Sequence, residues 1–189
     1  VDIPPFWRLL LASWNQEDRD TTQRELEIQH RAKRDGWSEG LVREAIELHG
    51  PRLKVVQDFS AAPPMAKDAD PKKFVRLDVE YPRPYVKFDF GASLLPFAAA
   101  SKRSLLVRAE AMEREIGAWI SLDSITPDEG SRLNEKGHGL DSPVIGFTHL
   151  MQELEVADPD AARREVIAWE VHDGPVFQRL RIWAAGRPG

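Results

Sequence analysis

Cysteine is absent from this 189-residue sequence, which excludes a disulfide framework and a zinc site with thiolate ligands. Long hydrophobic runs are also missing. Residues 94–100 form one of the longest apolar stretches, far short of the ~20 residues that a membrane-spanning helix needs. The N-terminus lacks the basic and then apolar pattern of a secretory signal peptide. These absences predict a cytoplasmic protein with no membrane partner.

The charge balance is mildly acidic. The chain has 26 Lys and Arg against 31 Asp and Glu, a net charge of −5, which argues against a nucleic-acid surface covering the whole domain. Basic clusters occur at 30–34, 101–103, 163–164 and 179–181, but acidic residues lie near each of them. We interpret them as solvated helix faces. A local basic patch that binds nucleic acid stays an alternative.

Helical signals dominate the first third of the chain. Apolar residues recur at helical spacing between residues that cap or stop helices, such as Ser38 before one helix and Gly36 after another. The connections between these helices are short, so the helices should pack antiparallel or in pairs. The predicted N-terminal helices cover residues 4–14, 21–36, 38–50 and 53–59.

Helical signals return in the last half of the chain. Residues 97–122 have the charge and apolar pattern of a long amphipathic helix that includes Trp119. Pro143, Pro159 and Pro175 each stand at a position where proline favours the start of a helix. The sequence therefore predicts one long helix and three shorter ones in this part.

Between the helical parts lies a region of different composition. Residues 60–73 are rich in proline and are the best candidate for a linker. Apolar and polar residues then alternate in 75–79 and again in 86–90, with Pro82 and Pro84 between the two stretches. The pattern fits a β-hairpin between these stretches or an extended excursion, because the prolines remove backbone donors.

The predicted fold class is mainly α. We expect an irregular stack of antiparallel helix pairs, HEAT-like or a bundle, with a short extended or β-hairpin excursion near 74–90. The chain divides into an N-terminal helical part (1–59), a linker and excursion (60–96) and a C-terminal helical part (97–189), or forms one continuous domain.

Catalytic patterns are not evident. The five histidines are scattered, without the spacing of a zinc-binding helix, and the closely spaced glutamate pairs point to different helix faces. His138 is flanked by glycines, so an enzyme that uses His138 and nearby carboxylates stays open as a third hypothesis. We predict no catalytic, cofactor-binding or metal-binding residue.

Aromatic residues supply the candidates for an interaction surface. The predicted last helix carries Phe177 and Trp183, which need neighbours, and aromatic residues also come early in the chain. This distribution predicts that the chain is a piece of a longer protein. The candidate interaction residues, in this helix and in the excursion, are Tyr81, Tyr85, Phe88, Phe177 and Trp183.

Two stretches carry a family resemblance, PFWRLLLASW at 5–14 and HDGPVFQRLRIWA at 172–184. They resemble the HEAT-like helical arrays of large bacterial anti-phage and signalling proteins. In those proteins such arrays follow a sirtuin-type NAD-cleaving domain or a nucleotide-binding domain of the signal-transducing ATPase class. The resemblance implies a noncatalytic scaffold or sensor region whose partners are adjacent domains or another subunit. It transfers no functional residue.

The leading functional hypothesis is therefore a noncatalytic helical scaffold or protein-binding segment of a larger multidomain bacterial protein, and the resemblance implies a role in anti-phage defence. The alternative is a self-contained interaction module, such as an inhibitor or immunity protein, that acts through residues 60–96 and their aromatic side chains.

Overall fold

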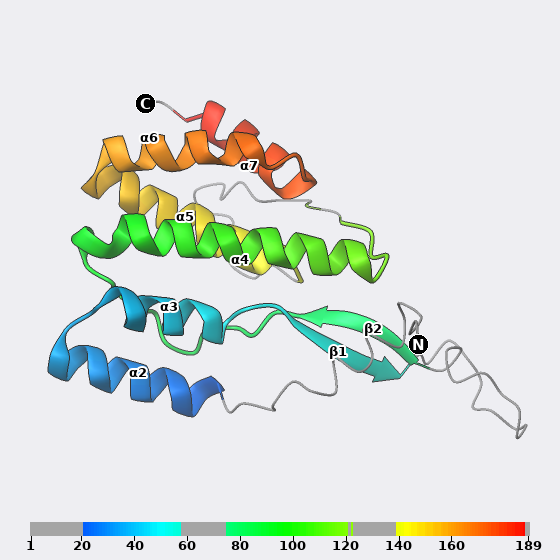
Figure 1. Cartoon of the computed structure of the whole chain (residues 1–189), viewed down its shortest axis with the longest axis horizontal. Coiled ribbons are helices and arrows are strands. Elements are labelled where there is room, and N and C mark those ends of the chain that lie inside the picture. Colours follow the sequence, from blue (N-terminus) through cyan, green and yellow to red (C-terminus); the bar gives the residue numbers. More distant parts are fainter. Residues whose placement is uncertain (1–20, 58–74, 121, 123–138, 188–189) are drawn as a thin grey trace, which may run out of the picture.

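The structure is a stack of helix pairs. The computed structural model describes residues 21–57, 75–120, 122 and 139–187. In Figure 1, α2 and α3 lie at one end of the stack, α4 and α5 in the middle, and α6 and α7 at the other end. This arrangement confirms the mainly-α prediction. The helices are α2 (Thr21–Asp35), α3 (Glu39–Leu48), α4 (Leu95–Glu115), α5 (Asp141–Ala157), α6 (Pro159–Ile167) and α7 (Pro175–Ala185).

Local sequence signals set most helix ends. Gly36 follows α2 with φ 80°, a left-handed conformation that glycine adopts without strain. The Ser38 hydroxyl accepts a hydrogen bond from the Leu41 N–H at 3.3 Å and so caps α3. Asp158 caps α6 in the same way, accepting from the Ala161 N–H at 2.9 Å. The predicted starts of these helices are thus confirmed. The helix predicted over 4–14 and the loop around His138 lie outside the described residues.

The prediction of a helix over 53–59 is wrong. Arg52–Gln57 forms strand β1, which pairs antiparallel with strand β2, Val75–Glu80. Arg52 stands opposite Glu80 and Leu53 opposite Val79. Leu53 and Val79 are buried together, and side chains from the C-terminal end of α4 pack against them. The pairing buries Leu53 and Val79, and this burial stabilises the strand more than the short helical pattern favours a helix.

The predicted short β excursion near 74–90 is confirmed, but of the two alternatives for it the hairpin between 75–79 and 86–90 does not form. Residues 75–80 are a strand, but their partner is β1, and residues 81–90 contain no strand. Pro82 and Pro84 lack the N–H groups that a ladder needs, and the N–H groups of Tyr85 and Val86 bind the Glu25 side chain. Residues 81–90, called the excursion from here on, run as a loop to a short 3₁₀ turn at Ala92–Leu94.

The long helix is shorter than predicted. Helix α4 ends at Glu115, and Gly117 follows in a left-handed conformation with φ 74°. Trp119, expected inside the helix, therefore lies beyond it and is 91% exposed. Among the described helices, none has the length and apolarity needed to cross a bilayer.

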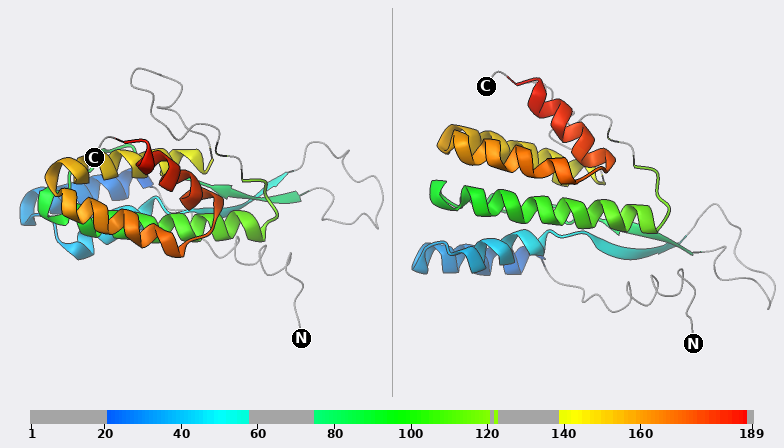
Figure 2. Two further views of the ribbon diagram at one scale, coloured as in Figure 1. Left: turned by 90° about the horizontal axis from the view of Figure 1, so that it is seen from above. Right: turned by 45° about the horizontal axis from the view of Figure 1, so that its top comes forward.

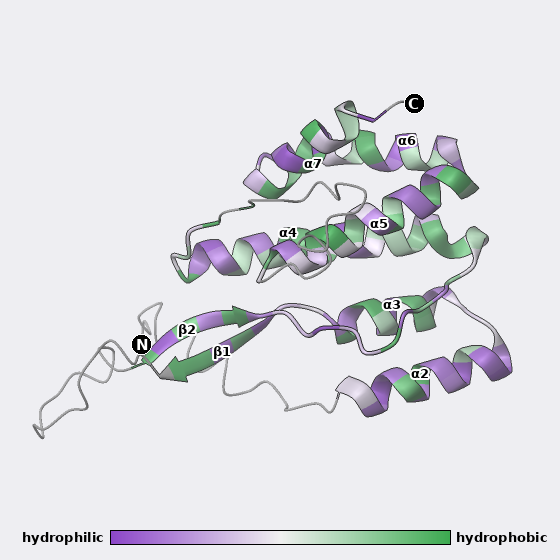
Figure 3. Ribbon diagram, turned by 180° about the vertical axis from the view of Figure 1, so that it is seen from behind, coloured by the Kyte–Doolittle hydropathy of each residue, from purple (hydrophilic) through white to green (hydrophobic). Residues whose placement is uncertain are grey.

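One hydrophobic core joins the two helical parts. Buried side chains from α2, α3, α4, α5, α6 and α7 form a single cluster, so these six helices pack as one unit. In Figure 3, α2 is mostly hydrophilic, as expected for a helix at the end of the stack, and Figure 2 shows α7 crossing over α5 and α6 at the opposite end. The largest fully buried side chains are Trp169, Phe147 and Phe177.

A buried carboxylate holds the start of α7. The Glu110 side chain on α4 accepts hydrogen bonds from Arg114 Nη2 at 3.0 Å and from the Val176 N–H in the first turn of α7. This position suits a carboxylate, since the first turn of a helix has unpaired N–H groups. Burial raises the pKa of Glu110. A Cβ atom on Gly174 would collide with the Glu110 carboxylate, so a larger residue there requires the Glu110 side chain to move.

Replacing Gly174 by alanine is expected to lower the free energy of unfolding by about 1–3 kcal/mol, because the Glu110 carboxylate must leave the α7 terminus. Gly186→Ala is the matched control, since its nearest contact would be an ordinary 3.7 Å. Urea unfolding of both variants measures the difference. Equal stability of the two variants would show that the Glu110 side chain can move without a loss of unfolding free energy.

Candidate functional site

A cavity of about 720 Å³ lies between the excursion, α3, α4 and α5. Leu105 and Leu106 of α4 form part of its surface, together with Ile46 of α3. The excursion forms one wall with Val86 and with aromatic and proline side chains, and α5 forms the facing wall. The surface is thus mainly apolar, with a few polar groups from the excursion, from α4 and α5, and from His49 after α3.

The excursion wall is fixed from behind by Glu25 of α2. This side chain is fully buried. Its Oε2 atom accepts hydrogen bonds from the backbone N–H groups of Tyr85 at 2.8 Å and Val86 at 2.6 Å. Its Oε1 atom lies 2.9 Å from Nε2 of His49, the residue directly after α3. One carboxylate therefore ties the wall of the cavity to two helices.

Aromatic packing holds the same wall at its other end. The Trp37 ring, between α2 and α3, meets Phe88 edge-on with ring centroids 5.6 Å apart and Phe90 at 4.9 Å. Such edge-to-face pairs add to the energy of burial alone. The excursion has no strand or helix, so these aromatic contacts and Glu25 define its path.

Lys102 brings an ammonium group to the cavity. It projects from α4, and its Nζ atom lies 3.3 Å from the carbonyl oxygen of Gly146 on α5. Gly146 lines the cavity and has no side chain, which keeps the space beside Nζ open. Burial lowers the pKa of Lys102 to about 8, although the negative charge of Glu153 acts in the opposite direction. Lys102 is therefore mainly protonated at pH 7.

Other charged groups stand around the cavity. Glu153 of α5 pairs with Lys87 of the excursion, with 3.0 Å between Lys87 Nζ and Glu153 Oε1. His149 of α5 also lines the cavity and is exposed. Within the described ranges, no three His, Asp or Glu side chains converge as metal ligands would. The arrangement is suited to holding an apolar molecule with one polar end.

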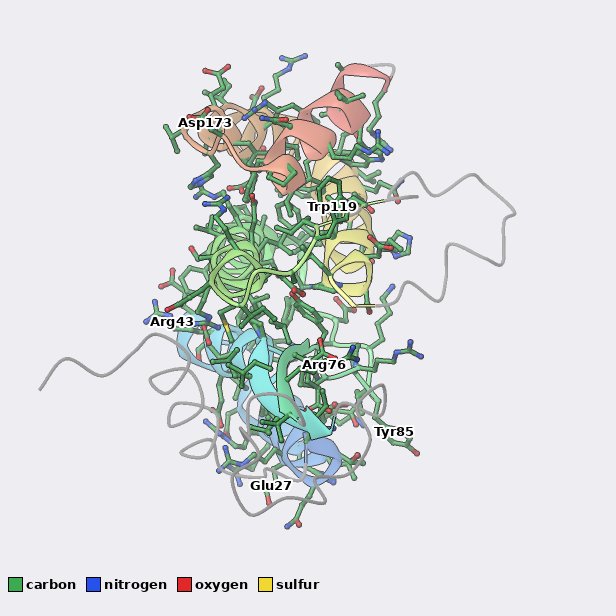
Figure 4. The ribbon with its side chains drawn as sticks, turned by 90° about the vertical axis from the view of Figure 1, so that its right-hand side faces the viewer. Glu27, Arg43, Arg76, Tyr85, Trp119 and Asp173 are labelled. Atoms are coloured by element: carbon green, nitrogen blue, oxygen red, sulfur yellow. The ribbon has the colours of Figure 1, made fainter. Side chains whose placement is uncertain are left out.

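Three of the predicted interaction residues meet at this cavity. Tyr81, Tyr85 and Phe88 all line it. Tyr81 donates its hydroxyl to Glu113 Oε1 at 2.8 Å, and burial raises the pKa of this tyrosine. Phe88 is half-buried against Trp37. Tyr85 is 73% exposed and points away from the body of the molecule in Figure 4.

The other two predicted interaction residues do not join this site. Phe177 and Trp183 are only 1% and 8% exposed, and both belong to the hydrophobic core. Their apolar side of α7 packs onto the helix stack, so the chain itself provides the neighbours that these aromatic residues need. They form no exposed surface in the structure.

Glu25 and Lys102 are the site residues that sequence reasoning missed. Lys102 stands three, four and seven residues before Leu105, Leu106 and Ala109, which are all buried, so it lies on the apolar stripe of α4. Glu25 stands three residues before the buried Ile28 on α2. A charged residue in register with an apolar stripe was the available signal. This signal is missed when Lys102 is interpreted as part of a solvated basic cluster.

No family model matches this sequence, and comparison with curated proteins and with solved structures gives no match either. The functional argument therefore rests on the cavity and the residues around it.

Proposed function

We propose that this chain is a noncatalytic ligand-binding module that takes a small, largely apolar molecule into the cavity between the excursion, α4 and α5. The observation that carries the proposal is the cavity itself, of about 720 Å³ and mainly apolar. Sites that enclose small organic ligands commonly measure about 300–1,000 Å³ and have apolar walls with a few fixed polar groups.

The cavity is partly open to solvent, so it is a concave surface that a ligand can reach from outside. The cavity wall is also secured by a buried carboxylate that uses both of its oxygens. A wall held in this way supports a persistent concave surface.

The same wall offers a route from the ligand to the rest of the protein. A ligand that contacts Tyr85 and Val86 touches the two residues whose N–H groups bind Glu25 of α2. Binding would therefore bear on the placement of α2 and α3. This coupling fits the role of a sensor region in a larger cytoplasmic bacterial protein, the role that the resemblance to anti-phage arrays implies.

A protein-binding scaffold is the second candidate function, favoured by two exposed aromatic side chains. Trp119 is 91% exposed and Tyr85 is 73% exposed. Tryptophan and tyrosine are enriched among the residues that dominate protein interfaces. In this form of the proposal the partner is an adjacent domain or another subunit.

The test of the ligand-binding proposal uses Nile red, an uncharged apolar dye that fluoresces when it leaves water. We expect saturable binding to the wild type and at least about tenfold weaker binding to Gly146→Leu, whose side chain would enter the cavity beside Lys102. Gly40→Leu, on the exposed start of α3, is the matched control and should bind like the wild type. Unsaturable binding, or equal binding by both variants, would contradict a site in this cavity.

A further inference from the structure

Lys102 has hydrogen-bonding capacity that the described residues do not use. An ammonium group has three N–H donors. Among the residues that the structure describes, the carbonyl oxygen of Gly146 is the acceptor within hydrogen-bond distance of Lys102 Nζ, at 3.3 Å. The neighbouring lining residues Leu105, Leu106 and Leu150 are apolar. A positive charge with spare donors therefore stands at the edge of an apolar space.

The charges around Lys102 limit which anion fits. Glu153 lies close enough to influence the Lys102 pKa and would repel a second negative charge. Lys87 pairs with Glu153 and offsets part of that repulsion. One ammonium beside one partly neutralised carboxylate suits a ligand with a single negative charge better than a phosphate dianion.

We propose that Lys102 makes the cavity selective for apolar molecules that end in a single carboxylate, such as medium-chain monocarboxylates. The carboxylate would accept the free N–H donors of Lys102, and the apolar chain would lie along Leu105, Leu106 and the excursion. This inference rests on the proposed ligand-binding function and adds the chemical class of the ligand.

The experiment compares decanoate with decanol, which has the same chain without the charge, by titration calorimetry at pH 7. We expect Lys102→Met to weaken decanoate binding about tenfold to a hundredfold, the range for a hydrogen-bonded charge, and to leave decanol binding within about twofold. Lys33→Met, on the exposed last turn of α2, is the matched control and should bind both compounds like the wild type.

A pH series gives a second readout on the wild type. Between pH 7 and 9.5 decanoate stays ionised while Lys102, with a pKa of about 8, loses its charge, so decanoate affinity should fall several-fold and decanol affinity should not. Glu153 and His149 of α5, Lys87 of the excursion and His49 after α3 also line the cavity. Comparison with Lys102→Met at each pH isolates the contribution of Lys102.

Lys102→Met should fold at pH 7. The Lys102 pKa is lowered from 10.5 to about 8 in the folded protein, so the unfolded chain binds more protons between these values and stability rises with pH there. Below pH 8 the buried charge opposes folding, and methionine removes it. If the variant nevertheless unfolds, the wild-type pH series tests whether decanoate binding depends on the charge of Lys102.

The outcomes separate the two proposals. Decanol binding with no preference for decanoate, or decanoate affinity that does not change with pH or with Lys102→Met, would overturn the role of Lys102 and leave the cavity proposal standing. Failure of Nile red, decanoate and decanol alike to bind would overturn the ligand-binding function itself.

Discussion

Replacing Glu25 by alanine is expected to lower the free energy of unfolding by about 3–5 kcal/mol, because three part-buried hydrogen-bonding groups lose their partner together at a fully buried position. The N–H groups of Tyr85 and Val86 and the ring of His49 all meet this one carboxylate, which is fully buried. Urea unfolding measures the loss. Nile red binding should weaken as well, because the excursion wall loses its anchor.

Two further variants make the Glu25 prediction specific. Glu25→Gln keeps the size and one acceptor oxygen, so its stability should fall between the wild type and the alanine variant. Glu27→Ala removes an exposed carboxylate from the same helix, at the outer edge of the molecule in Figure 4, and should change stability by less than about 0.5 kcal/mol. Equal stability of Glu25→Ala and Glu27→Ala would show that the excursion does not depend on Glu25.

Helix ends were predictable because their causes are local. Ser38 and Asp158 cap helices through their own side chains, and Gly36 ends α2 through its own backbone conformation. Each cause acts within about four residues of the helix end. The same local rules placed α3, α5, α6 and α7 close to their observed positions.

The strand at Arg52–Gln57 was not predictable in the same way. A run of apolar residues this short fits a buried strand or a helix turn equally well, and periodicity does not separate them. Pairing with β2 is what makes this segment a strand. Val75, the first residue of β2 in the sequence, stands opposite Gln57, the last residue of β1. That pairing is a contact between segments well separated in the sequence, which no local window contains.

The candidate site was half predictable. Tyr81, Tyr85 and Phe88 could be selected because aromatic residues beside prolines are suited to contacts, and they do line one cavity. The bond from Glu25 to Val86 spans 61 residues, and the contact from Lys102 to Gly146 spans 44. Periodicity can flag Glu25 and Lys102 as charges on apolar stripes, but only the fold supplies their partners.

Phe177→Ala should rank with the most damaging single substitutions, at about 3–5 kcal/mol of unfolding free energy, because it removes a fully buried ring from the core. The ring also packs against the His172 ring in a tilted arrangement, with centroids 4.6 Å apart, at the turn that leads into α7. Thermal or urea unfolding gives the value, with near-UV circular dichroism as a check on tertiary packing.

Ile182→Ala is the matched control on the same helix, since Ile182 is 66% exposed and its loss should cost less than about 0.5 kcal/mol. The contrast separates two views of this helix. If the apolar side of α7 served a partner instead of the stack, both substitutions would be mild in the isolated chain and Phe177→Ala would weaken only the complex. A large loss at Phe177 alone means that α7 completes the core, so Phe177 and Trp183 are not free for a partner, whereas the cavity beside Lys102 and the exposed Tyr85 and Trp119 stay available for binding.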